Sequence, residues 1–178
     1  MQHFGYSKES KIPYDIIYTK SKYIGRTFIQ NTQNKRRKLV ALKLNPLKNS
    51  IKGKRIVLID DSIVRGTTLA KQVKTLRELG AKEIHLRVAA PPFKDICYFG
   101  TDIDDKESLI ANGRTVEEIR KIIGSDTLEY LSIENLKEIT KECNMDGFCM
   151  GCFNSKYPIE VPKEIKKDRF EEKINNNI

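Results

Sequence analysis

The stretch between residues 54 and 90 constrains the fold most, because its hydrophobic pattern alternates strand, helix and strand. The segment KRIVLID (54–60) contains an unbroken apolar run and predicts a strand that is buried on both faces. From Thr67 a helix is expected, ending near Gly80, whose apolar face holds Leu69, Val73, Leu76 and Leu79. The next strand is predicted at 83–90, before two prolines. This order is typical of a βαβ unit, so the sequence predicts an α/β protein with a parallel sheet.

The other predicted elements are short. Strands are expected at 14–18 and 127–132, and helices at 107–111, 115–124 and 132–142. Thr115 and Glu118 have the spacing of a capping box, and Ser132 suits the cap of the last helix. We expect residues 1–162 to form one domain and residues 163–178 to be a charged tail, either a frayed helix or disordered.

Several protein classes are disfavoured by the composition. The sequence contains no run of 18 apolar residues and no apolar stretch near its start, which argues against a membrane span and a secretory signal. The cysteines cluster, at positions 97, 143, 149 and 152, unlike a disulfide framework. Metal binding or reduced thiols fit better, so a cytoplasmic location is expected.

Positive charge is concentrated in residues 35–55. This segment holds nine Lys or Arg and no acid, which equals the net charge of +9 for the whole chain. Two interpretations remain open: the segment binds an anion, such as nucleic acid or a phosphorylated metabolite, or it is a solvated basic loop.

The acidic pair Asp60–Asp61 follows a predicted strand, where ligands bind in open parallel sheets. The helix expected from Thr67 would offer free backbone N–H groups to a phosphate. Gly66 allows close approach of the backbone, and hydroxyl donors are supplied by Ser62, Thr67 and Thr68. The carboxylates suit a metal ion or sugar hydroxyls, so the pattern indicates a phosphorylated ribose. The alternative is that Asp60 and Asp61 only cap the helix.

The string RIVLIDDSIVRGTT (55–68) resembles the ribose-phosphate binding motif of type I phosphoribosyltransferases. Other segments resemble, in the same order, the glutamine phosphoribosylpyrophosphate (PRPP) amidotransferase family: GYSKESKIPY, KYIGRTFIQ, GAKEIHLRVAAPP, CYFGTDI, ESLIANGRTVEEI and DTLEYLSIENL. The resemblance runs from about Phe4 to about Pro162. It implies the type I phosphoribosyltransferase fold, a mainly parallel sheet flanked by helices.

The resemblance also implies roles for individual residues. Asp60 and Asp61 would contact the ribose hydroxyls and Mg²⁺. The 5-phosphate of PRPP would be held by Ser62, Ile63, Val64, Arg65, Gly66, Thr67 and Thr68. A flexible loop that closes over the substrate would contain Lys22, Tyr23, Arg26 and Thr27. Arg26 can contact pyrophosphate with two hydrogen bonds, so the catalytic set implied is Asp60, Asp61 and Arg26.

The implied reaction is the first step of de novo purine synthesis. Ammonia displaces pyrophosphate from PRPP and forms 5-phosphoribosylamine, with Mg²⁺ as cofactor. Two other interpretations remain open. The first is a non-catalytic regulator of the same fold, which binds either nucleotides or, through residues 35–55, nucleic acid. The second is an inactive fragment.

The cysteines resemble those of the iron–sulfur subgroup of this family. Cys97, Cys149 and Cys152 would supply three of the four thiolates of a [4Fe–4S] cluster. Asp146 stands where the subgroup often has another cysteine, and Cys143 is offset from it. A zinc site and unligated, reduced thiols remain alternatives.

Whole members of this family begin with a glutaminase domain whose N-terminal cysteine attacks glutamine, whereas residue 2 here is Gln2. The pyrophosphate-loop strand expected before GYSKES is also missing. We therefore expect a C-terminal part of such an enzyme, truncated at the N-terminus of the transferase domain. The resemblance further implies a homo-oligomer inhibited by purine nucleotides, with the glutaminase domain as its ammonia source.

Overall fold

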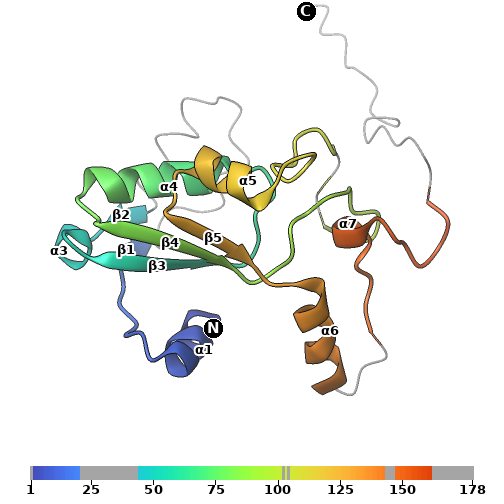
Figure 1. Ribbon diagram of the computed structural model, residues 1–178, viewed down its shortest axis with the longest axis horizontal. Helices are drawn as coiled ribbons and strands as arrows, with labels where there is room; N and C mark the ends of the chain where they lie inside the picture. Colours follow the sequence, from blue (N-terminus) through green and yellow to red (C-terminus); the bar gives the residue numbers. More distant parts are fainter. Residues whose placement is uncertain (1, 21–43, 102, 104, 143–146, 162–178) are drawn as a thin grey trace, which may run out of the picture.

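The computed structural model describes residues 2–20, 44–101, 103, 105–142 and 147–161 (Figure 1). At its centre is a three-stranded parallel sheet in the order β3–β4–β5, formed by Arg55–Asp60, Glu83–Val88 and Thr127–Tyr130. The predicted parallel βαβ unit is therefore confirmed. The strand expected at 83–90 ends two residues earlier, at Val88, before the proline pair.

Two helices cover one face of this sheet, α4 (Thr67–Glu78) and α5 (Val116–Ile123) (Figure 1). Helix α4 buries three residues of its predicted apolar face, Leu69, Val73 and Leu76. The capping box predicted at α5 is present, because the Thr115 hydroxyl accepts from the Glu118 N–H and the Glu118 carboxylate accepts from the Thr115 N–H. A helix that is amphipathic and capped in this way forms where the sequence places it.

The expectation that β3 is buried on both faces was wrong for the described residues. Ile56 is buried, but Val57, Leu58 and Ile59 are only partly buried. The neighbouring strand β4 alternates, with Ile84, Leu86 and Val88 buried and the intervening residues partly exposed. The physical reason is that α4 and α5 pack on a single face, so Val57 and Ile59 lie on the other face, while Leu58 shares the face of Ile56 and packs against the core without being fully covered.

The remaining elements surround this unit. An antiparallel ribbon pairs β1 (Tyr18–Lys20) with β2 (Leu44–Pro46). The strand predicted at 14–18 thus begins only at its last residue. The other helices in the described part of the chain are α1 (Gln2–Ser10), α3 (Lys48–Ile51), α6 (Ile133–Glu142) and α7 (Gly151–Asn154). The Ser132 hydroxyl accepts from the Asn135 N–H at 3.0 Å, as expected for the cap of α6.

The helix predicted at 107–111 is not formed, and the chain makes turns there. Leu109, Ile110 and Ala111 are all buried although they are consecutive. A helix with a single apolar face cannot bury three consecutive residues equally, whereas a turn packed between two hydrophobic clusters can.

Those clusters are distinct. The main core lies between the sheet and helices α4 and α5. What we call the second cluster consists of Phe93, Ile103 and Leu109, with Val64, Ile96, Cys97, Cys152 and Phe153 packed against it. The loop between β3 and α4 contributes one residue to each cluster. Ile63 belongs to the main core, and Val64 packs against the second cluster. This loop is therefore anchored on two sides.

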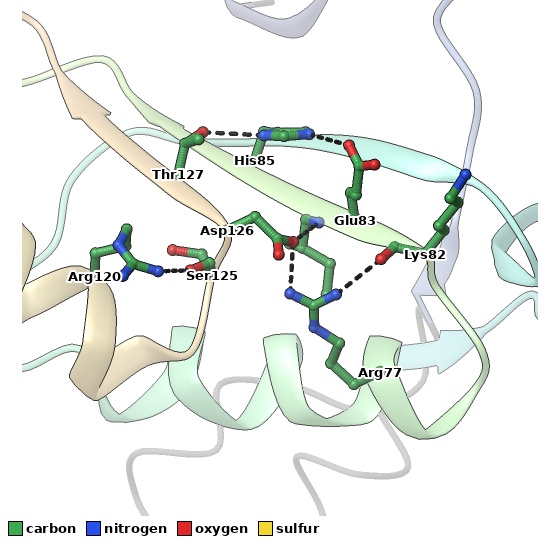
Figure 2. A network of polar contacts seen from close by, with 9 residues as sticks. Arg77, Lys82, Glu83, His85, Arg120, Ser125, Asp126 and Thr127 are labelled. Carbon is green, nitrogen blue, oxygen red and sulfur yellow. Dashed lines mark hydrogen bonds and ion pairs between the residues drawn. The ribbon is translucent and has the colours of Figure 1, made fainter.

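A polar network ties the amino-terminal ends of β4 and β5 to the helices (Figure 2). Asp126 accepts from the Ile84 N–H and from the guanidinium of Arg77, which also donates to the Lys82 carbonyl at 3.1 Å. Arg120 of α5 donates to the Ser125 carbonyl at 2.7 Å. The last turn of α4 is thus fixed against the sheet at the amino-terminal end of the strands, whereas Asp60 lies at the carboxyl end.

None of the helices described is long and apolar enough to cross a membrane.

Candidate active site at the end of strand β3

The acidic pair lies where the sequence places it, at the carboxyl end of β3. Asp60 is the last residue of the strand and pairs with Val88 of β4, and its carbonyl accepts from the Ala89 N–H at 2.9 Å. The Asp60 carboxylate accepts from the Asp61 N–H at 3.0 Å, and the Asp61 carboxylate accepts from the Ser62 hydroxyl at 3.3 Å. Both carboxylates are thereby oriented at the strand end.

Burial raises the pKa of Asp60, and the charge of Asp61 adds to this, although the Asp61 N–H works in the opposite direction. Two adjacent carboxylates, one of them half-buried, repel each other when both are ionised. A divalent cation or hydroxyl donors of a ligand would relieve this repulsion. The pair is therefore chemically suited to Mg²⁺, which proteins often bind through one or two carboxylates together with substrate phosphates.

The loop after the pair leads directly into α4. Gly66 is the N-cap residue and has left-handed backbone geometry (φ +73°), and it supplies no side-chain cap to the helix. Among the described residues, the first N–H groups of α4 therefore lack the usual side-chain acceptor of an N-cap, and the positive end of the helix dipole points the same way. Such a helix start binds a phosphate readily.

The side chains of the loop divide into anchors and exposed groups. Ile63 is buried in the main core and Val64 packs on the second cluster, so these two residues offer a ligand only their backbone groups. The groups left at least partly accessible are Asp61, Ser62, Arg65, Thr67 and Thr68. The apolar residues thus hold the loop, while acidic, basic and hydroxyl groups face outward.

The flexible-loop residues predicted from the sequence lie outside the described residues: Lys22, Tyr23, Arg26 and Thr27. The same holds for residues 35–43 of the basic segment.

The structure brings two of the three predicted cysteines to the same place, because Cys97 and Cys152 both pack on the second cluster. Cys149 is exposed and does not belong to that cluster. Burial raises the pKa of Cys152 to about 11, with smaller contributions from Cys97 and Cys149. Burial also acts to raise the pKa of Cys97, but hydrogen bonds from the Phe99, Thr101 and Gly100 amides outweigh it and lower the value.

Metal ligation by these thiols is not seen in the described part of the chain, where no three His, Cys, Asp or Glu side chains are grouped to hold a metal ion. Cys143 and Asp146, the other positions considered for a fourth ligand, lie outside the described residues. The amide donors around Cys97 nevertheless favour a negatively charged sulfur there.

One residue with a place in this site was not anticipated. Ile110 contacts the loop at Gly66 and donates its N–H to the Val64 carbonyl at 2.9 Å. The sequence indicates this contact only indirectly, through the glycine at the start of α4, which leaves room for a neighbouring side chain.

Comparison with known proteins agrees with this geometry. The chain is 48% identical over 165 residues to the amidophosphoribosyltransferase of Synechococcus elongatus, covering 93% of this chain and 33% of that protein. It is 51% identical over 167 residues to the amidophosphoribosyltransferase of Methanothermobacter thermautotrophicus, covering 92% of this chain and 34% of the relative. The chain thus spans about a third of the length of the curated relatives that it matches.

A solved structure with the same fold is the glutamine PRPP amidotransferase from B. subtilis complexed with ADP and GMP. It superposes with a TM-score of 0.75 at 43% identity, over 90% of this chain and 36% of that chain. The family profile described as phosphoribosyl transferase domain matches residues 3–122, which include β3, the acidic pair and α4. The chain therefore belongs to the phosphoribosyltransferase family and has its type I fold.

Proposed function

We propose that this chain is the transferase part of an amidophosphoribosyltransferase, which forms 5-phosphoribosylamine and pyrophosphate from PRPP and ammonia. The observation that carries the proposal is the pair Asp60–Asp61 beside the uncapped start of α4. Together they provide complementary sites for ribose hydroxyls and for a 5-phosphate. The relatives named amidophosphoribosyltransferase support the choice of ammonia as acceptor.

In this proposal the loop and helix start hold the non-reacting end of the substrate. The 5-phosphate accepts hydrogen bonds from backbone N–H groups near Gly66 and from the hydroxyls of Ser62, Thr67 and Thr68. Binding energy gained there orients the ribose so that its anomeric carbon faces the incoming ammonia. The apolar anchors Ile63 and Val64 keep this cradle rigid.

Asp60 and Asp61 act on the ribose. Their oxygens accept hydrogen bonds from its hydroxyl groups and favour the positive charge that develops as the bond to pyrophosphate breaks. Mg²⁺, when bound by these carboxylates and the substrate, would neutralise the leaving pyrophosphate. Arg26, with Lys22, Tyr23 and Thr27, is assigned to the loop that covers the pyrophosphate and excludes water.

The cysteines are assigned a structural role in the same proposal. Cys97, Cys149 and Cys152 would supply three thiolates to a [4Fe–4S] cluster, and the amide donors around Cys97 fit such a ligand. This iron–sulfur cluster would link the segment after β4 to α7, beside the hydrophobic residues of the second cluster. None of Cys97, Cys149 and Cys152 forms a disulfide, and reduced cysteines suit a reducing compartment, so we assign the protein to the cytoplasm.

The proposal is extended to regulation and pathway. The B. subtilis relative is complexed with ADP and GMP, and a second structural neighbour, 43% identical, is described as the allosteric regulatory enzyme of purine biosynthesis. We therefore assign the chain to purine synthesis, with purine nucleotides as inhibitors.

The test is pyrophosphate release from PRPP by the 178-residue chain, with Mg²⁺ and either ammonium or glutamine as nitrogen donor. We expect slow release with ammonium and none with glutamine. The sequence holds two histidines, His3 and His85, and in the described part of the chain the His85 ring bonds to Thr127 and Glu83 rather than to a Ser or Cys nucleophile. The chain could instead fail to bind PRPP but bind nucleic acid tightly and with a steep salt dependence. That result would favour the alternative interpretation, a non-catalytic regulator of the same fold.

A further inference from the structure

The loop of the candidate site is contacted by a segment more than 40 residues away in the sequence. A Cβ atom added at Gly66 would lie 2.3 Å from Cδ1 of Ile110, which is far below van der Waals separation. Gly66 is also left-handed, with φ +73°. A side chain at this position would be strained by the backbone geometry, and it would also have to displace the terminal methyl group of Ile110, which packs directly on Gly66.

The same residue controls a carbonyl group in the loop. The Ile110 N–H donates to the Val64 carbonyl oxygen at 2.9 Å. A loop that cradles an anion must present N–H groups to it and keep carbonyl oxygens away, since a carbonyl carries partial negative charge. The bond from Ile110 holds the Val64 carbonyl on the side of the core, so this oxygen does not turn toward a phosphate at the start of α4.

The segment that carries Ile110 is itself held in place. Leu109 is fully buried in the second cluster, on which Val64 also packs, and Ile110 belongs to the main core together with Ile63. Arg114 donates to the Ile110 carbonyl at 3.2 Å. We call residues 109–111 the brace, because they join both clusters beneath the loop and contact it through backbone and side chain.

We propose that Ile110 is a positioning residue that holds the loop between β3 and α4 in the shape that binds the phosphate of a ribose 5-phosphate group. This inference rests on the proposed function. Ile110 itself does not touch the substrate. It acts through Gly66, whose backbone it supports, and through Val64, whose carbonyl it engages. Pre-organisation of the loop in this way raises affinity because less ordering is needed when the ligand binds.

The experiment compares two variants with the same chemical change. Ile110→Val and Ile119→Val each remove one methyl group from a buried isoleucine of the main core, at 5% and 1% exposure. Both should lower the melting temperature to a similar degree. We expect the affinity for ribose 5-phosphate, measured by calorimetric titration of the full chain, to fall about threefold or more in Ile110→Val only.

A rescue experiment isolates the contact itself. Gly66→Ala should reduce the affinity strongly, because the new methyl group meets Cδ1 of Ile110. Ile110→Val removes that atom, and the next atom of residue 110 lies 3.5 Å from the added Cβ, which is an ordinary contact. The strain of an alanine in the left-handed backbone geometry remains, so the double variant should regain only part of the lost affinity. Its affinity should be about fivefold higher than the two single-variant losses, added together, would give.

The outcomes separate the two proposals. If the unmodified chain binds ribose 5-phosphate, but Ile110→Val behaves like Ile119→Val and the double variant shows no recovery, the positioning role is wrong and the proposed function stands. If the unmodified chain does not bind ribose 5-phosphate, both proposals are overturned.

Discussion

At the scale of single residues, the acidic pair concentrates the chemistry of the site. Asp61 is exposed at the strand end and is held by the Ser62 hydroxyl, whereas Asp60 is half-buried and holds the Asp61 N–H. The two carboxylates therefore differ in environment although they are neighbours. In the proposed function, Asp61 would meet a solvated ligand, and Asp60 would combine ligand contact with the cost of burying a charge.

The first prediction concerns Asp61. Asp61→Asn keeps the shape of the side chain but removes its charge, so ammonium-dependent pyrophosphate release should fall by about 100-fold or more. Glu78→Gln, at the exposed end of α4, is the matched control and should leave the rate unchanged. The measurement is pyrophosphate release at saturating Mg²⁺. An unaltered rate in Asp61→Asn would remove this residue from the catalytic set.

The second prediction concerns stability and pH at Asp60. Its pKa is raised in the folded chain, so the folded state binds the proton more tightly than the unfolded state does. The unfolding free energy should therefore decrease as the pH rises from the ordinary value of 3.8 through the raised pKa. Asp60→Asn should escape this loss and unfold at higher temperature than the unmodified chain at pH 7.

Thermal unfolding of both proteins between pH 3 and pH 7 checks this sign. The melting temperatures should converge as the pH falls, because the protonated Asp60 carboxyl and the amide that replaces it in the variant are both neutral. A variant that melts lower at pH 7 would mean that the ionised Asp60 carboxylate stabilises the fold, contrary to this prediction.

At the scale of elements, the position of α4 is set at both of its ends. Its start is fixed by the loop and the brace, and its last turn by Arg77, which reaches Asp126 and the Lys82 carbonyl (Figure 2). Burial acts to raise the pKa of Asp126, but the Ile84 N–H and Arg77 outweigh it and lower the pKa. The ionised carboxylate is therefore the form that stabilises this junction.

The third prediction is that Asp126→Ala lowers the unfolding free energy by about 1–3 kcal/mol, because the Ile84 N–H and Arg77 lose their acceptor. Since the folded pKa of Asp126 lies below 3.8, its contribution is present above that pH and is lost as the pH falls further. Chemical denaturation at pH 7 and at pH 3 measures both effects. Glu78→Gln, which breaks only an exposed pair with Lys74, should change stability by less than about 0.5 kcal/mol.

At the scale of the whole molecule, the proposed function couples ligand binding to folding, because the candidate site joins the sheet, α4 and the brace. A ligand that needs all three binds only the folded chain, so it raises the unfolding free energy according to its concentration.

The fourth prediction is that PRPP together with Mg²⁺ raises the melting temperature, because binding adds about 2.7 kcal/mol to the unfolding free energy at a ligand concentration 100 times the dissociation constant. Mg²⁺ alone should have little effect, because two carboxylates without the substrate phosphates make a weak site. Differential scanning fluorimetry measures the shift. Equal shifts in the unmodified chain and in Asp61→Asn would argue that the ligand binds elsewhere.

The sequence by itself determined the local features of this protein. The strand predicted at 54–60 is present at 55–60, and the helix from Thr67, the capping box of α5 and the acidic pair at a strand end are present as predicted. Each depends on residues within a few positions of one another, such as the 3.6-residue spacing of apolar side chains or a carboxylate three residues after a threonine. Local patterns of this kind specify local structure without further information.

Only the tertiary structure decided which faces are covered and what supports the site. It showed that β3 is buried mainly on one face and that residues 107–111 form turns, because Leu109, Ile110 and Ala111 pack between two clusters rather than along one helix face. It also brought Ile110 against Gly66, a contact between residues 44 positions apart. Burial and contact at such separations depend on how the elements pack, and the spacing of residues along the chain carries no information about that.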